Sequence, residues 1–176
     1  LVLKHRLAAQ IKKIYLLQKG KALVPNYNLQ VQQVLAEKLK EAGVEVHYSG
    51  IGKVNAAFKA FEVIQKTGCK TLLNLGTAGS SYFDAHELVE VTQYVQRDMD
   101  VSPLGFDVGV TPVDTDYPAE INLDGFFAHL NKGTCGTGDN FETGTPKVAC
   151  NLVDMEGYAL AKVCKKLGVR LISVKY

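Results

Sequence analysis

The stretch that decides the fold is residues 151–157, NLVDMEG, which runs directly into residues 158–164, YALAKVC. An apolar pair leads into a compact acidic cluster, and the apolar residues that follow take the i, i+3, i+4, i+7 spacing of a helix. The pattern predicts the end of a strand followed at once by a helix. Because ligands of open α/β sheets bind beyond the carboxyl ends of strands, Glu156 stands where a polar substrate would be held.

The acidic residues Asp154 and Glu156 also have a second interpretation. Carboxylates at the start of a helix favour the positive end of its dipole without any ligand being involved. On this stretch alone the two interpretations weigh evenly, so the rest of the chain has to decide between them.

Strand and helix patterns alternate through the rest of the chain. Expected strands cover residues 11–17, 44–48, 70–75, 88–95, 134–137 and 169–176, and expected helices cover residues 1–10, 31 to about 43, 54–67 and 126–130. The order β-α-β-α-β up to residue 75 predicts an α/β domain with a largely parallel sheet. Prolines and glycines punctuate a long irregular region from Pro103 to about Gly125, and loops of that length are usually functional or contact a partner.

The composition of the 176 residues, 47% hydrophobic and 22% charged, is typical of one globular domain, which we expect to cover residues 1–176. The net charge is +2, with 20 basic residues scattered among 18 acidic ones, so no basic stripe marks a nucleic-acid partner. No apolar run approaches the roughly 20 residues needed to span a bilayer, and the N-terminal charges do not follow the order of an export signal. Neither nucleic acid nor a membrane is expected as a partner.

The cysteines and histidines show no metal-ligand spacing. The four cysteines form no C-x-x-C pair and lie within or beside apolar segments, which favours reduced, mostly buried thiols in a cytoplasm. The four histidines are interpreted as surface or core residues. We therefore expect no metal site.

Two turns that contain glycine stand next to expected helices or strands. Gly50-Ile51-Gly52 opens the helix 54–67, and residues 75–80, LGTAGS, follow a strand. Both turns are able to place backbone N–H groups against an anion or a sugar hydroxyl. Neither is a Walker loop, and Asn55 stands where the dinucleotide fingerprint has its third glycine. By themselves such turns are more often plain connections than ligand sites.

Four motifs in one order resemble a known family. They are residues 50–57 (GIGKVNAA), 74–79 (NLGTAG), 137–141 (TGDNF) and 154–159 (DMEGYA). Their order and spacing resemble the purine and uridine phosphorylase superfamily, most of all its 5'-methylthioadenosine/S-adenosylhomocysteine nucleosidase branch, from about residue 44 to residue 176. The resemblance implies a three-layer α/β/α fold of the nucleoside phosphorylase type, with a mixed, largely parallel central sheet. It also implies hydrolysis of the N-glycosidic bond of purine nucleosides, most of all 5'-substituted adenosines, without a cofactor.

One position separates the nucleosidases of this superfamily from the phosphorylases. The phosphorylases carry a phosphate-binding arginine in the strand before the glycine turn, where this chain has Asn74. A neutral amide lacks the planar cationic fork that suits a phosphate dianion. Water is therefore expected as the nucleophile. A phosphate-dependent purine or uridine phosphorylase remains an alternative, as does a nucleoside-binding protein without catalysis.

The resemblance also assigns roles to residues. Glu156 resembles the glutamate that accepts hydrogen bonds from the ribose hydroxyls, and Met155 resembles the methionine that lies along the sugar. Phe141 resembles the aromatic residue that stacks on the purine, and the backbone of Glu142 would face the base, although family members usually have an apolar residue there.

The remaining assignments concern the walls of the site. The floor beneath the sugar would consist of Thr77, Ala78 and Gly79. The apolar wall around the 5' substituent would consist of Ile51, Val101 and Leu104, with Phe106 lent by a second copy of the chain. The loop 103–118 contains several apolar residues and little charge, which favours an interface and predicts a homodimer.

Two carboxylates of the family have no counterpart in the 176 residues. Glycoside cleavage needs an acid for the leaving base and a group that orients water. The family's acid follows the strand that here ends at Tyr176, and its water-orienting glutamate follows the first strand, where this chain has Lys19-Gly20-Lys21. We therefore expect the chain to be incomplete at its C-terminus. The resemblance as a whole implies a cytoplasmic enzyme of methionine salvage.

Overall fold

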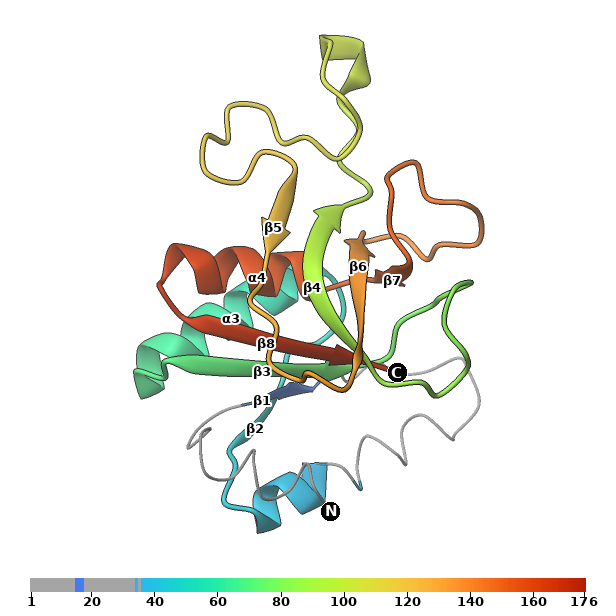
Figure 1. The fold of residues 1–176 in the computed structure, drawn as a ribbon. Helices are drawn as coiled ribbons and strands as arrows, with labels where there is room; N and C mark the ends of the chain where they lie inside the picture. Colours follow the sequence, from blue (N-terminus) through green and yellow to red (C-terminus); the bar gives the residue numbers. More distant parts are fainter. Residues whose placement is uncertain (1–14, 18–33, 35) are drawn as a thin grey trace.

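A computed structural model describes residues 15–17, 34 and 36–176, and in this part of the chain a mixed sheet of eight strands forms the centre (Figure 1). The strands are β1 (Tyr15–Leu17), β2 (Val46–Tyr48), β3 (Thr71–Gly76), β4 (Val89–Gln96), β5 (Glu120–Asn122), β6 (Asn131–Thr137), β7 (Leu152–Asp154) and β8 (Arg170–Lys175). The helices described in full are α3 (Lys53–Thr67) and α4 (Gly157–Lys166), with a short 3-10 helix η1 (Ser102–Leu104), and residues 36–41 are also helical.

The sheet consists of two parallel sets joined antiparallel. Its order is β2-β1-β3-β8-β4-β6-β7, and β5 pairs with β4 outside this path. The set β2, β1, β3, β8 is parallel throughout, as is the set β4, β6, β7, and β8 meets β4 antiparallel. In Figure 1 β3 and β8 run across the view whereas β4 and β6 run up it, which shows how strongly the sheet twists. The predicted mixed, largely parallel sheet is confirmed.

Alternation along the central strands creates a core on each face of the sheet. Leu72 of β3 and Leu171 of β8 pack in the core that contains the buried sides of α3 and α4. Their neighbours Leu73 and Ile172 point to the opposite face and pack in a second core. That second core includes Leu39, which belongs to the described part of the helix expected from residue 31. The three-layer arrangement follows from this alternation.

Helix α3 begins and ends at glycines. Gly52 precedes it with a φ of 90°, and Gly68 ends it in the left-handed region with a φ of 61°, donating its N–H to Ile64 O. These conformations are strained for any residue with a Cβ, so the two glycines determine the limits of the helix. The helix therefore starts directly beyond the turn at Gly50-Ile51-Gly52, as the sequence predicted.

The expected helix over residues 126–130 is wrong, because residues 126–127 have no regular secondary structure and residues 128–129 form a turn. The buried carboxylate of Glu90 accepts the N–H groups of Phe126 at 2.7 Å and Phe127 at 3.0 Å. Lys132 pairs with the same carboxylate and donates to Phe127 O. The N–H groups of residues 126 and 127 would have no acceptor inside a helix that starts there. The Leu130 N–H donates to Phe127 O at 3.3 Å, which closes a turn in place of a helix.

Residues 99–118, here called the protruding segment, leave the sheet after β4 and return to it as β5 (Figure 1). This is most of the region expected to be irregular, and the structure adds η1 and β5 to it. Ion pairs of Asp114 with Lys162 and of Asp116 with Lys166 tie the returning part to α4. The expected helix over residues 1–10, and the start of the expected strand before residue 15, lie outside the described residues.

Candidate active site

The junction between β7 and α4 places Glu156 directly before the first residue of the helix. The residue is buried, with 3% of its surface exposed. Its Oε1 accepts a hydrogen bond of 2.9 Å from the backbone N–H of Gly52. Two motifs that lie 104 positions apart in the sequence therefore meet at one carboxylate.

Asp154 stabilises the start of the helix, whereas the Glu156 side chain makes no capping hydrogen bond. Asp154 Oδ2 accepts the N–H of Gly157 at 3.0 Å, and its Oδ1 accepts the hydroxyl of Thr137 at 2.6 Å. The Thr137 oxygen in turn accepts the N–H of Tyr158 at 2.8 Å. The first amides of α4 are thus satisfied without Glu156. Hydrogen-bonded capping of the helix is therefore the role of Asp154 and not of the Glu156 side chain, and the ligand-binding role of Glu156 stays a prediction.

Lys175 completes this buried cluster, and the sequence analysis did not identify it. Its side chain has no exposed surface, and its Nζ lies 2.8 Å from Asp154 Oδ2. The apolar residues Leu171, Ile172 and Val174 that precede Lys175 were the signal present in the sequence, because a lysine buried with them needs a partner of opposite charge.

Burial raises the pKa of the Glu156 carboxyl above its ordinary value. The hydrogen bond from Gly52 and the charge of Lys175 oppose this rise, while the charge of Asp154 adds to it. The site therefore holds a carboxyl group whose ionisation depends on its surroundings more than that of a surface glutamate does.

The glycine turn after β3 lies against β7. Gly79 and Val153 exchange two backbone hydrogen bonds, of 2.9 and 2.8 Å, and the N–H of Ala78 donates to Tyr176 O at 3.2 Å. These contacts hold the predicted floor, Thr77, Ala78 and Gly79, beside the strand that leads into Met155. Met155 itself is half-buried.

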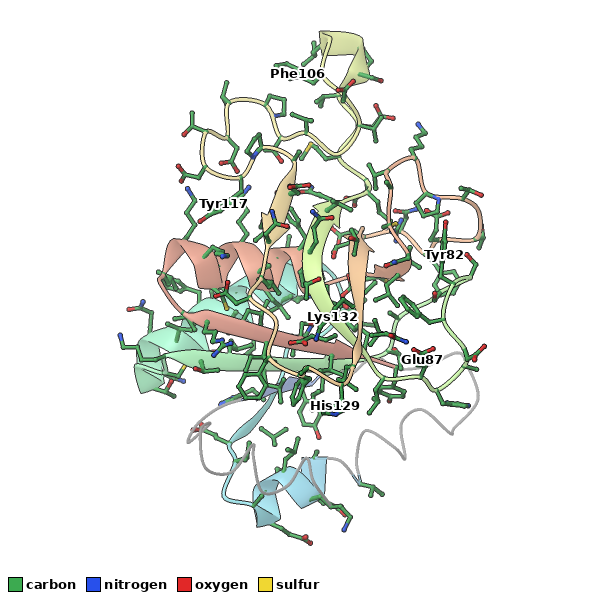
Figure 2. All side chains as sticks on the ribbon, in the orientation of Figure 1. Tyr82, Glu87, Phe106, Tyr117, His129 and Lys132 are labelled. Carbon is green, nitrogen blue, oxygen red and sulfur yellow. The ribbon has the colours of Figure 1, made fainter. Side chains whose placement is uncertain are left out.

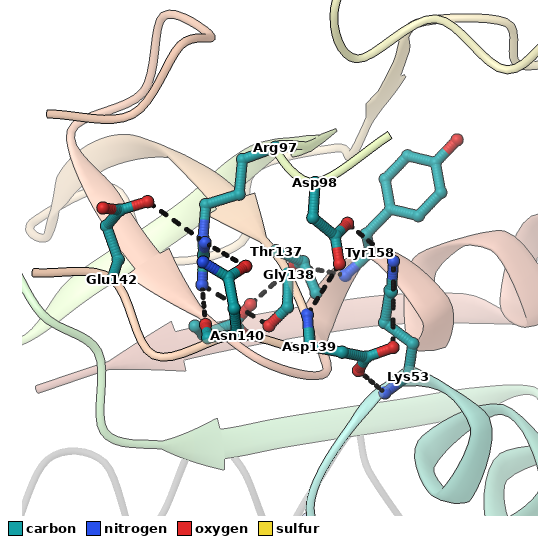
Figure 3. Close-up of polar contacts among 10 residues, drawn as sticks. Lys53, Arg97, Asp98, Thr137, Gly138, Asp139, Asn140, Glu142 and Tyr158 are labelled. Atoms are coloured by element: carbon teal, nitrogen blue, oxygen red, sulfur yellow. Dashed lines mark hydrogen bonds and ion pairs between the residues drawn. The ribbon is translucent and has the colours of Figure 1, made fainter. Parts of the chain in front are cut away.

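A polar network joins the ends of β4 and β6 to the start of α3 (Figure 3). Asp139 Oδ1 accepts the N–H of Lys53 at 2.7 Å, and Asp98 Oδ2 accepts the N–H of Asp139 at 2.7 Å. Lys53 Nζ donates to Asp98 Oδ1 at 2.6 Å. Since Lys53 follows Gly52 directly, this network orients the turn that contacts Glu156. Asp98 follows a strand end, which is the signal that would have identified it.

The two predicted base-binding residues differ in what their side chains do. Phe141 is 78% exposed and presents its ring at the surface of the segment after β6. Glu142 instead directs its carboxylate to Arg97, with Oε2 accepting from Nη1 at 3.2 Å. The Glu142 side chain is therefore engaged within the protein, and its backbone is what remains for a ligand.

The residues of the predicted apolar wall lie in two places. Ile51 belongs to the turn next to Glu156 and is exposed. Val101, Leu104 and Phe106 lie on the protruding segment, and Figure 2 shows Phe106 at its far end, away from the sheet. Within one chain the structure therefore does not bring Phe106 to the Glu156 cluster.

Asn74 is completely buried in the middle of the sheet. Its amide donates to Tyr94 Oη at 3.3 Å and to Ser173 Oγ at 3.1 Å. The Tyr94 and Ser173 hydroxyls lie 2.6 Å apart, which closes a polar triad inside the core. The position that carries the phosphate-binding arginine of the phosphorylases here serves the packing of the sheet.

A groove of about 880 Å³ adjoins the site on the outer side of β7. It is lined by residues 79–82 and 142–153 together with Gln93 and Thr134. Gly79 and Glu142 belong to both the groove and the predicted site, whereas Met155 and Glu156 do not line the groove. The buried cluster is thus a neighbour of this groove rather than its floor.

In the part of the chain that the structure describes, no group of three or more histidine, cysteine or acidic residues is arranged to hold a metal ion. All four cysteines are free, and only Cys150 is partly exposed. Among the described residues, no helix has the length and apolar character needed to cross a membrane.

Comparison with known proteins defines the class to which this fold and site belong. The sequence profile described as Phosphorylase superfamily matches residues 22–176. The chain therefore belongs to the phosphorylase superfamily, which confirms the resemblance carried by the four motifs.

Within this superfamily the similar curated proteins are nucleosidases. A 5'-methylthioadenosine/S-adenosylhomocysteine nucleosidase of Anoxybacillus flavithermus is 29% identical over 157 residues, which cover 78% of this chain and 68% of that protein. An aminodeoxyfutalosine nucleosidase of Campylobacter jejuni is 30% identical over 155 residues, covering 75% of this chain and 66% of the relative. The chain thus spans about two thirds of the length of these relatives.

Solved structures of the same group share the fold. The 5'-methylthioadenosine/S-adenosylhomocysteine nucleosidase of Campylobacter jejuni superimposes with a TM-score of 0.73 at 23% identity, covering 93% of this chain and 84% of the other. The futalosine hydrolase of Helicobacter pylori superimposes with a TM-score of 0.73 at 21% identity, covering 94% and 87%. The expected nucleoside phosphorylase-type fold is confirmed.

Proposed function

We propose that this protein is a purine nucleosidase that hydrolyses the N-glycosidic bond of 5'-substituted adenosines and releases the base. One observation carries the proposal: Glu156 is a buried carboxylate held by Gly52 at a strand-to-helix junction, and it is not used to cap the helix. A carboxylate kept at such a junction without a capping role is suited to accept hydrogen bonds from sugar hydroxyls. The nucleosidase relatives support the reaction.

In this proposal some residues of the site contact the ribose of the substrate and others contact its purine base. Glu156 accepts hydrogen bonds from the ribose, Met155 lies along the sugar, and the turn at residues 77–79 forms the floor. Phe141 stacks on the purine, and the backbone at Glu142 contacts its edge. The reaction passes through an oxocarbenium-like sugar, whose developing charge a carboxylate close to the ribose stabilises.

Hydrolysis is favoured over phosphorolysis by the surroundings of two residues. The Asn74 amide is neutral, fully buried and bonded to Tyr94 and Ser173. Arg97, which stands near the base-binding segment, is also buried, and its terminal nitrogens already donate to Gly138, Asn140 and Glu142. Neither position offers a free guanidinium fork to a phosphate dianion.

A homodimer is part of the proposal, because Phe106 of the predicted apolar wall lies away from the site within one chain. Helix α3 exposes an apolar stripe at Val54, Phe58 and Phe61, and Phe58 is 70% exposed. The stripe begins beside Ile51, at the turn that contacts Glu156. A second copy that covers this stripe is suited to supply Phe106 from its own protruding segment.

We further propose that the enzyme acts in the cytoplasm, which its free, mostly buried cysteines support, and that it serves methionine salvage.

The test is a turnover assay on the full-length protein with separate nucleosides. The substrates are 5'-methylthioadenosine, S-adenosylhomocysteine, adenosine and uridine, each with and without phosphate. We expect adenine release from the 5'-substituted adenosines, free sugar as the second product, and no dependence on phosphate. A sugar phosphate product would establish the phosphorylase alternative. Tight nucleoside binding without turnover would establish the non-catalytic alternative.

A further inference from the structure

Arg97 lies in a slot formed by glycines of the neighbouring strand. Its side chain is 3% exposed although it stands at the end of β4, next to the protruding segment. A Cβ placed on Gly138 would lie 2.8 Å from Arg97 Cζ and 2.9 Å from Nη1, and one placed on Gly136 would lie 3.4 Å from Cδ. The glycines before and after Thr137 therefore make the room that the Arg97 side chain occupies.

The segment after β6 wraps around this guanidinium group (Figure 3). Arg97 Nη1 donates to Asn140 Oδ1 at 2.9 Å and to Glu142 Oε2 at 3.2 Å. Nη2 donates to the carbonyl oxygens of Asn140 and Gly138. The backbone N–H of Arg97 also donates to Thr137 O at 2.9 Å. One side chain thus organises the backbone and side chains on both sides of Phe141.

Glu142 continues the arrangement on the far side of Phe141. Its Oε2 bonds to Arg97, and its Oε1 accepts the N–H of Gly144 at 2.9 Å. Phe141 between these anchored neighbours is 78% exposed, so packing of its own ring does little to determine its position. The direction of the ring depends on the backbone at residues 140 and 142, which the Arg97 contacts hold.

We propose that Arg97 is a positioning residue for base recognition, which acts by holding residues 138–142 so that the Phe141 ring and the Glu142 backbone face the purine. The inference rests on the proposed function, because it takes Phe141 as the residue that stacks on the base. It adds a role for Arg97, and it explains why an acidic residue stands at position 142. The Glu142 carboxylate is the counter-ion of the buried guanidinium group, and not a contact to the base.

The fork geometry of arginine is essential to this role. The two terminal nitrogens reach acceptors on three residues at once, which requires a planar group with several fixed donors. A lysine at position 97 keeps the charge but supplies a single rotatable ammonium group, so it would hold only part of the segment. Asp98, the next residue, acts separately by anchoring Asp139 and Lys53.

The test measures base affinity in four single variants of the full-length protein and in the combined variant Arg97→Met/Glu142→Gln. Arg97→Met removes the fork, Arg97→Lys keeps only the charge, and Glu142→Gln removes the counter-ion. Arg170→Met is the matched control, because Arg170 is exposed and lies over the Phe126 ring at 5.2 Å, on another part of the sheet. Calorimetric titration with adenine gives the affinity of the folded protein, steady-state turnover gives KM and kcat, and a thermal melt gives stability.

We expect Arg97→Met to weaken adenine binding on the order of ten-fold or more, since losing charge-assisted bonds on both sides of Phe141 releases the segment. The KM for the nucleoside should rise by a similar factor. Arg97→Lys should fall between Arg97→Met and the unaltered protein, and Arg170→Met should bind as the unaltered protein does. The combined variant Arg97→Met/Glu142→Gln should lose less than the sum of the two single losses, because the two side chains share one interaction.

Several outcomes would overturn the inference. A lower melting temperature of Arg97→Met with unchanged adenine affinity would show a purely structural residue. Additive losses in the combined variant would separate Glu142 from Arg97. If Arg97→Met does not fold, the other two single variants decide. The inference is wrong if Arg97→Lys and Glu142→Gln bind adenine as tightly as the unaltered protein does. If the unaltered protein binds neither adenine nor nucleoside, the proposed function is wrong, and this inference is wrong with it. If the unaltered protein and Arg97→Met bind adenine equally well, only this inference is wrong.

Discussion

Glu156 and Asp154 are two residues apart and have different roles because the chain changes direction between them. Asp154 is the last residue of β7, and its side chain points inward to Thr137 and Lys175. Glu156 follows the turn and points to Gly52. The inward carboxylate has a cation and two hydrogen-bond donors, so it is a structural group, and the other stands at the predicted ribose site.

Replacing Glu156 by Gln tests the ribose site directly. The amide keeps the shape of the side chain but offers a neutral acceptor in place of a charged one, which should cost about 1.5–3 kcal/mol of nucleoside binding. Adenine has no ribose hydroxyls, so its affinity should remain unchanged. Calorimetric titration with an adenosine analogue and with adenine separates these effects. Equal weakening of both ligands would remove Glu156 from the ribose site.

The raised pKa of Glu156 predicts a dependence of nucleoside affinity on pH. Burial favours the protonated carboxyl, which cannot accept hydrogen bonds with both oxygens. Nucleoside affinity should therefore fall as the pH decreases through a value above the ordinary pKa of a glutamate. The measurement is KM or Kd across the acidic range, with Glu156→Gln as the reference, which should show a flat profile there. A midpoint at the ordinary glutamate value would contradict the prediction.

The raised pKa of Glu156 also makes the stability of the folded protein depend on pH, with greater stability at low pH. The folded protein holds the Glu156 proton more tightly than the unfolded chain does. The contribution is therefore fully present below the pKa of the unfolded state and is lost as the pH rises through the folded pKa. Glu156→Gln should remove this part of the pH dependence of the free energy of unfolding.

At the scale of elements, the ion pair of Lys175 with Asp154 joins β8 to the start of α4. Both side chains are buried, at 0% and 1% exposure, so neither charge is hydrated. Lys175→Met leaves the Asp154 carboxylate without its cation and should destabilise the protein by about 3–5 kcal/mol. Urea unfolding measures this, with Lys165→Met on the exposed side of α4 as the control. The combined variant Lys175→Met/Asp154→Asn should be milder than Lys175→Met alone, and an equal or larger loss would contradict the argument.

Packing of α4 against β4 depends on the absence of a side chain at Gly157. A Cβ there would lie 2.1 Å from the Tyr94 ring, and that ring is held by Ser173 and Asn74 and has no exposed surface. Gly157→Ala should therefore lower the free energy of unfolding by about 1–3 kcal/mol or more through overpacking. The control is Gly125→Ala, where the nearest atom would be 3.8 Å away. Equal thermal melts of the two variants would show that the helix moves without cost.

At the scale of the whole molecule, the exposed apolar stripe on α3 predicts assembly. Phe58→Glu places a charge in the middle of the stripe, and burying an unpaired carboxylate in a dimer interface is costly. Sedimentation should show a dimer for the unaltered protein and a monomer for Phe58→Glu at the same micromolar concentration. Ala128→Glu adds the same charge at an exposed turn elsewhere and should leave the dimer intact. A monomeric unaltered protein would remove both the dimer and the loan of Phe106.

Loss of the dimer should also reduce activity, because the apolar wall of the site would be incomplete. In Phe58→Glu, KM should rise more for 5'-substituted adenosines than for adenosine, since the wall contacts the 5' substituent. Equal effects on the two substrates would place Phe106 outside the site.

Among the described residues, the sequence by itself determined most of the order of strands and helices and the glycine turns, although it missed β5 and predicted a helix over residues 126–130 that does not form. It also determined the position of Glu156 at a strand end. These features depend on local periodicity and on backbone conformations that glycine adopts, so neighbouring residues contain the signal. The four motifs added the family, which the superfamily match over residues 22–176 confirms.

The tertiary structure alone decided which distant groups meet. Residues 126–130 have a helical pattern, but they form a turn, in which Glu90, 36 positions before Phe126, accepts the Phe126 N–H and Lys132 donates to Phe127 O. Arg97 holds a segment more than 40 positions later in the chain, and Asp154 rather than Glu156 caps the helix because Thr137 and Lys175 approach it. Hydrogen bonds and buried charges of this kind depend on positions in space. The neighbours of a residue in the sequence indicate whether that residue lies in a helix, a strand or a turn. They do not indicate which distant groups it contacts.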